Sequence, residues 1–63
     1  MIIDKIYSEC IKELSPINIL YCARKNEEKP FGYVIDYIKD MYNISKIEAW
    51  DTAKAICEYF NLA

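Results

Sequence analysis

The chain has 63 residues, 54% of them hydrophobic, and a formal net charge of −2 at pH 7. A chain this short forms one domain at most. Its core is thin, because folding buries only ~60% of the surface that the unfolded chain exposes. Its acidic balance opposes general binding to nucleic acids or acidic membranes, which needs clustered Lys and Arg. No apolar run approaches the ~20 residues that span a bilayer and no secretory signal is recognisable, so the sequence predicts a cytoplasmic protein that does not enter the membrane.

The first element is predicted as an amphipathic helix over residues 2–14. Its apolar side chains recur at i, i+3 and i+4, which is the spacing of one helix face. They are Ile3, Ile6, Tyr7, Cys10, Ile11 and Leu14. Charged and polar side chains occupy the opposite face, so this helix is expected to bury one side only.

Ser15-Pro16 predicts the end of this helix and the start of a second one over residues 16–25. The residue before a proline avoids the helical region, whereas Pro at the first helical position loses no hydrogen bond. One stripe of the second helix consists of Ile17, Leu20, Tyr21 and Arg24. Other positions are apolar too, so burial on several sides is expected. Residues 17–23 also fit a strand, because periodicity does not separate the two in a short apolar run.

A loop over residues 26–30 leads into the third predicted helix at residues 31–42. Asn26 is expected to end the second helix in the left-handed conformation. The apolar stripe of the third helix consists of Phe31, Val34, Ile35, Ile38, Met41 and Tyr42. Tyr33 and Tyr37 fall to one side of this stripe, with Asp36 and Asp40 beside them.

The fourth predicted helix covers residues 46–60. Ser45 and Glu48 match a capping box, in which the serine hydroxyl and the glutamate carboxylate each accept a bond from the other residue's backbone N–H. Ile44 is expected to pack against the first turns, and Leu62 to fold back beyond Asn61. The predicted inward stripe is Ile47, Trp50, Ala53 and Cys57, with Trp50 in or against the core and with Ala49, Ile56 and Phe60 beside the stripe. The whole chain, residues 1–63, is therefore predicted as a single all-α domain, a compact bundle of about four short helices.

No catalytic, cofactor or metal site is predicted. The chain contains no His, so a Ser–His or Cys–His pair cannot form within it, and one glycine is too few for a phosphate-binding loop. Three cysteines without CxxC spacing do not make a zinc site, and the thiols are interpreted as buried and reduced. The alternative is a reactive Cys22, whose pKa Arg24 and Lys25 could lower.

Aromatic and acidic side chains carry the functional prediction. The chain has six tyrosines, and a core this small cannot provide hydrogen-bond partners for six buried hydroxyl groups, so some of the rings are expected at the surface. Tyr is also enriched at protein interfaces. The predicted partner-binding residues are Tyr33, Asp36, Tyr37, Asp40, Asp51 and Glu58. Their charge would suit a partner protein with a basic surface.

The leading hypothesis is thus a protein-interaction module without enzymatic activity, acting as a stoichiometric regulator or inhibitor. The Ile-, Lys-, Tyr- and Asn-rich composition is typical of AT-rich genes, as in low-GC bacteria and their phages or other mobile elements. Self-association is left open. The alternative function is a small helix-turn-helix DNA-binding protein built on residues 31–60, although its second helix would offer only Lys46 and Lys54 as bases.

Overall fold

Four α-helices follow one another along the described chain. They are α1 (Ile2–Glu13), α2 (Pro16–Lys25), α3 (Pro30–Tyr42) and α4 (Lys46–Tyr59). The computed structural model describes residues 2–62, with side chains described from Asp4 onward, so Ile3 of the predicted first stripe lies outside the described side chains. The all-α bundle is confirmed, and each helix end lies within one residue of its predicted position. Residues 17–23 lie inside α2, which excludes the strand alternative.

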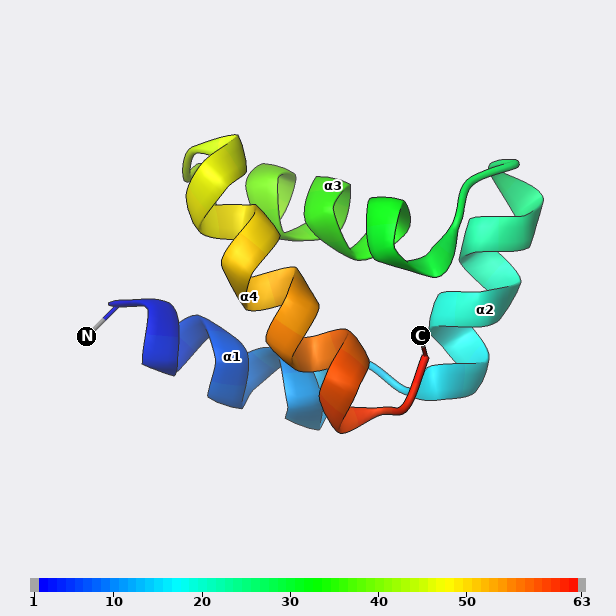
Figure 1. Ribbon diagram of the computed structural model, residues 1–63, viewed down its shortest axis with the longest axis horizontal. Helices are drawn as coiled ribbons and strands as arrows, with labels where there is room; N and C mark the ends of the chain where they lie inside the picture. Colours follow the sequence, from blue (N-terminus) through cyan, green and yellow to red (C-terminus); the bar gives the residue numbers. More distant parts are fainter. Residues whose placement is uncertain (1, 63) are drawn as a thin grey trace.

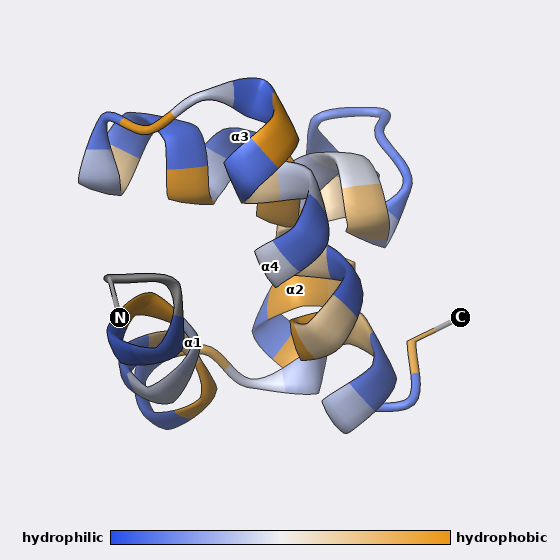
Figure 2. Cartoon of the chain, turned by 60° about the vertical axis from the view of Figure 1, so that its left-hand side comes forward, coloured by the Kyte–Doolittle hydropathy of each residue, from blue (hydrophilic) through white to orange (hydrophobic). Residues whose placement is uncertain are grey.

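Helix α4 holds the bundle together. It runs between α1 and α3 and packs against both, while α2 stands at one end of the molecule and packs against α3 (Figure 1). The Cα radius of gyration is 10.5 Å, as expected for a compact chain of this length, for which the size law gives about 10.6 Å. The hydrophobic and hydrophilic segments alternate along the helices in Figure 2, as they do in amphipathic elements.

The core is built mainly from isoleucines and small residues. Its buried members are Ile6, Cys10, Ile19, Val34, Ile35, Ile38, Ala49, Ala53, Ile56 and Cys57. Thr52 is the buried polar residue among the described side chains, and its hydroxyl donates to the Glu48 carbonyl at 3.1 Å, which satisfies it within α4. Small side chains at 49 and 53 allow α3 to approach α4 closely.

The predicted inward stripe of α4 is partly wrong. Ala53 and Cys57 are buried, but Ile47 is 78% exposed and Trp50 is 42% exposed. The face that packs inward is instead the one carrying Ala49, Thr52 and Ile56. Trp50 therefore lies against the edge of the core and not inside it.

Two further burial predictions are also corrected. Helix α2 buries only Ile19 and Ala23, and leaves Ile17, Leu20 and Tyr21 exposed, because α3 is the helix that packs against it. Met41, predicted on the buried stripe of α3, is 57% exposed near the end of that helix.

The helix ends largely follow the sequence signals. Ser15 caps α2, and Ser45 caps α4 in a complete capping box with Glu48. After α4, the Leu62 N–H donates to the Cys57 carbonyl, and Leu62 packs back on the core as predicted. After α2, however, Asn26 has φ −91° and the left-handed residue is Glu27 at φ 57°. The turn is one residue longer than predicted, since the Glu28 N–H bonds back to the Ala23 carbonyl.

Candidate protein-binding surface

Four of the predicted partner-binding residues lie together on one surface of α3. Tyr33, Asp36, Tyr37 and Asp40 occupy successive turns of the helix, and they line a shallow hollow of about 460 Å³. The loop before α3 and the end of α3 complete it. The added lining residues are Asn26, Glu28 and Met41. We call this surface the tyrosine–acid hollow.

The two tyrosines form an aromatic wall of this hollow. Their ring centroids are 6.4 Å apart with the planes tilted by 38°, and both rings are half-buried against the core. The pKa of Tyr33 is raised, mainly by a hydrogen bond to the Cys22 sulfur and to a smaller extent by burial. The pKa of Tyr37 is raised mainly by burial, and to a smaller extent by the nearby Cys10 and Glu13. Both phenols therefore stay neutral and held in place at physiological pH.

The carboxylates of the hollow repel one another. Glu28 hydrogen-bonds through its carboxyl group to Asp36, and this contact, followed by burial and the Asp36 charge, raises the pKa of Glu28. Two carboxylates this close repel each other, and a cation placed between them would relieve that repulsion. Asp40 lies one helical turn beyond Asp36 and is exposed. The hollow thus combines negative charge with an aromatic wall.

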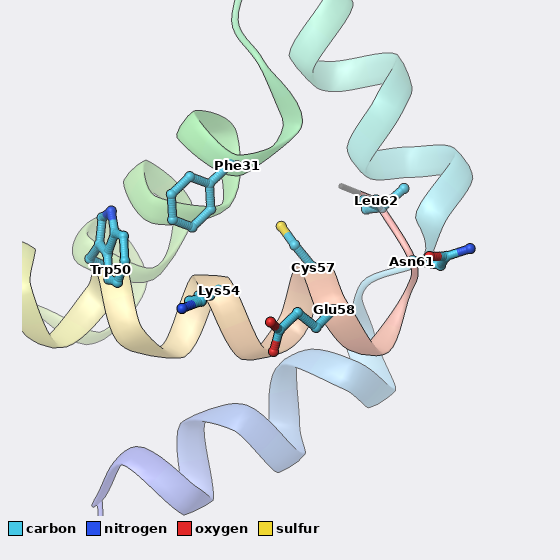
Figure 3. Close-up of a pocket in the computed structure, with 7 residues that line it drawn as sticks. All are labelled: Phe31, Trp50, Lys54, Cys57, Glu58, Asn61 and Leu62. Atoms are coloured by element: carbon cyan, nitrogen blue, oxygen red, sulfur yellow. The ribbon is translucent and has the colours of Figure 1, made fainter.

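The other two predicted partner-binding residues do not join this hollow. Asp51 and Glu58 are both exposed on α4. Glu58 lines a separate hollow of about 590 Å³, together with Phe31, Trp50, Lys54, Cys57, Asn61 and Leu62 (Figure 3). We call this second surface the tryptophan hollow. The six predicted residues therefore divide between the two helices and do not form one site.

Glu28, Asn26 and Met41 were missed by the sequence reasoning. Asn26 and Glu28 come from the loop, and the left-handed Glu27 between them turns the chain so that the Glu28 carboxyl reaches Asp36. An acidic residue just before a predicted helix was a usable signal, because it tends to fold over the helix N-terminus. Met41 was expected to be buried.

The three cysteines do not gather at one place in the fold. All three are free thiols, with Cys10 and Cys57 buried and Cys22 half-buried. Burial is the main cause that raises the pKa of Cys10 and of Cys57, which disfavours the nucleophilic thiolate. No group of side chains within residues 4–62 has the composition and spacing of a metal site.

A separate hydrogen bond joins α1 to the end of α3. The Tyr42 hydroxyl donates to Glu9 Oε1 at 2.9 Å in a half-buried setting. Burial and then this bond raise the pKa of Tyr42 well above its ordinary value. The bond links α1 to α3, and the buried Cys10 thiol lies beside the Tyr42 hydroxyl.

Comparison with known proteins finds no family model that matches the sequence, no similar curated protein and no similar solved structure. Among the described residues, no helix is both long enough and apolar enough to cross a bilayer. A proposal about function therefore rests on the surfaces described above.

Proposed function

We propose that this protein is a non-enzymatic interaction module that binds a partner protein through the tyrosine–acid hollow, and so acts as a stoichiometric regulator or inhibitor. The observation that supports this most directly is the gathering of Tyr33, Asp36, Tyr37 and Asp40, with Glu28, around one depression. Aromatic rings beside carboxylates suit Lys or Arg side chains, whose methylene stems pack on the rings while their charged heads meet the acids.

The partner is accordingly proposed to present a basic surface. A guanidinium or ammonium group placed between Glu28 and Asp36 would relieve their mutual repulsion. The proposed setting is a reducing cytoplasm, which accords with three free thiols in so small a protein. The low-GC bacterial or phage origin rests on composition alone.

DNA binding has less support. On α4, the helix that would enter a major groove, the exposed bases are Lys46 and Lys54, and the exposed acids are Glu48, Asp51 and Glu58. A recognition helix with more acids than bases would be repelled by phosphates. A titration with a DNA duplex at low salt checks this, and tight, salt-sensitive binding would replace our proposal with the DNA-binding alternative.

The test of the proposed function uses charge removal without loss of shape. The variant Asp36→Asn with Asp40→Asn keeps the size of both side chains, and Asp51→Asn with Glu58→Gln is the matched control on α4. Partners captured from the native host by the wild type are purified and titrated against all three proteins. We expect the α3 variant to bind at least about tenfold more weakly and the α4 variant to bind like the wild type. Equal binding by all three would contradict the proposal.

A further inference from the structure

The tryptophan hollow lies on α4, apart from the tyrosine–acid hollow, and is built from large apolar side chains. Trp50 meets Phe31 edge to face, with ring centroids 5.5 Å apart. Figure 3 shows Trp50 near one end of the hollow and Leu62 near the other, with Lys54 and Glu58 between them. Trp50 is the only Trp in the chain and retains 42% of its surface. Exposed tryptophans in such depressions are common anchors of protein interfaces.

The charges of this surface are arranged to complement themselves. Lys54 and Glu58 are four residues apart on α4, both are exposed, and both line the hollow. A second copy of α4 that runs antiparallel presents the same two charges in reverse order. If the two helices cross near residue 56, Lys54 of each copy faces Glu58 of the other, and the Trp50 end of each hollow faces the Leu62 end of the other. Trp50 would then enter the end of the partner's hollow that Leu62 lines.

We propose that this surface binds a second copy of the chain, forming a two-fold symmetric dimer through antiparallel α4 helices. A two-fold interface requires a patch that complements itself, and the Lys54–Glu58 order meets that requirement. With one base and one acid, this hollow carries no net charge that would attract the basic partner proposed for the other hollow. The dimer would also cover Trp50, a large exposed apolar residue of α4 that lines this hollow.

The expected dimer is weak. Helix α4 has 14 residues and is about 21 Å long. An interface of about 1,200 Å², the lower limit of the standard size, would take about 600 Å² from each copy, or roughly 13% of its 4582 Å² surface. Because the helices overlap only over residues 53–59, about 10 Å of helix, the hollows beside them must supply much of that area. We therefore expect a Kd of roughly 10 µM to 1 mM, which is typical of small transient interfaces.

Sedimentation of the full chain over this concentration range tests the dimer. We expect the average mass to rise towards two chains, and the Trp50 emission to shift to the blue as its ring leaves water. Lys54→Glu places two acids opposite each other in the dimer, and Glu58→Lys places two bases opposite each other. Each variant alone should self-associate at least about fivefold more weakly than the wild type. The control is Lys25→Glu, an exposed position on α2 away from this face, and it should dimerise normally.

Mixing the two variants gives the sharper result. Lys54→Glu and Glu58→Lys chains form opposite-charge pairs at both contacts with each other, so the mixture should associate at least as well as the wild type. The double variant Lys54→Glu with Glu58→Lys restores both pairs and should dimerise alone, which also shows that these substitutions permit folding. A wild type that stays monomeric up to about 1 mM, single variants that dimerise normally, or a mixture that does not associate would each overturn the proposal. None of these results depends on binding at the tyrosine–acid hollow.

Discussion

Ile56 and Trp50 lie on the same helix but have different energetic roles. Ile56 has 0% of its surface exposed and Trp50 has 42%. Since stabilisation by an apolar side chain grows with the area it removes from water, the smaller residue contributes more of its surface to the core. Size and hydrophobicity alone therefore misidentify the residue on which the core of α4 depends.

This difference predicts two unequal losses of stability. Ile56→Ala should cost about 2–5 kcal/mol, whereas Trp50→Ala should cost about 1–2 kcal/mol, below the ~3–5 kcal/mol of a fully buried tryptophan. A chain of 63 residues is stabilised by roughly 3–9 kcal/mol in total, so the first variant is close to unfolding and the second is not. Urea unfolding followed by circular dichroism measures both. Ile56→Val, expected to lose about 0.5–1.5 kcal/mol, is the control. A Trp50→Ala loss equal to that of Ile56→Ala would contradict the observed exposure.

At the scale of the element, α3 carries a glycine that its geometry does not need. Gly32 lies in the first turn of the helix, and its φ is not in the left-handed region. A Cβ added there would meet Glu28 Oε2 at 3.7 Å, which is an ordinary van der Waals distance. Glycine is therefore present at a cost in backbone entropy that no turn or close contact requires.

Gly32→Ala should accordingly stabilise the protein by about 0.4–1 kcal/mol. In a domain of this size that corresponds to a rise in Tm of a few degrees, measurable by thermal unfolding. The reverse change in the middle of α4, Ala55→Gly, is the matched control and should lower Tm by a similar amount. An unchanged or lower Tm for Gly32→Ala would mean that the Glu28 carboxyl needs the space beside residue 32.

The elements also show how far the sequence could predict the structure. Helix positions and the Ser15 and Ser45 caps are local properties, set by residues a few positions apart, so they were predictable. Which face of α4 turns inward was not predictable, because two adjacent stripes of this helix are both apolar and periodicity does not choose between them. Packing of α4 against both α1 and α3 buries Ala49 and Ile56 beside Ala53 and leaves Ile47 exposed. The same reasoning explains why α2 buries few of its apolar side chains. Its burial depends on packing against one neighbouring helix, α3, and not on its own composition.

The candidate site was predictable to a similar extent. The i, i+3 and i+4 spacing of Tyr33, Asp36, Tyr37 and Asp40 placed them on one side of α3, and the structure confirms that neighbourhood. The spacing along the sequence could not place Glu28 beside Asp36, because the path of the loop depends on the left-handed conformation of Glu27. Nor could it show that Glu58 lies in a different hollow, since the relative orientation of α3 and α4 is a tertiary property.

At the scale of the whole molecule, several buried acids of high pKa govern the response to alkaline conditions. Burial is the largest cause that raises the pKa of Tyr37, Tyr42, Cys10 and Cys57 above their ordinary values. A group whose pKa is raised on folding stabilises the fold below its unfolded pKa and loses that contribution as pH rises towards its folded pKa. Stability should therefore fall above about pH 9, where thiols and then phenols ionise in the unfolded chain.

Tyr42→Phe separates the contribution of one phenol. At neutral pH this variant should be less stable by about 1.5–3 kcal/mol, because the bond to Glu9 is lost. Above about pH 10 its stability should fall less steeply than that of the wild type, since the unfolded state gains one ionising group fewer. Unfolding in urea at a series of pH values between about 8 and 11 measures both effects. Parallel curves for the two proteins would show that Tyr42 does not titrate differently on folding.

The packing of α1 against α4 has a consequence during synthesis. Helix α1 ends at Glu13 and α4 ends at Tyr59, so the ribosome adds 46 residues between the two. At about 5–20 residues per second, the last helix follows the first by roughly 2–9 s. A helix forms in about a microsecond, which is far shorter than this interval. The interval during which α1 lacks its packing partner α4 is therefore set by the rate of synthesis. During this time Ile6 and Cys10, both buried in the finished protein, lack the α4 side of their core.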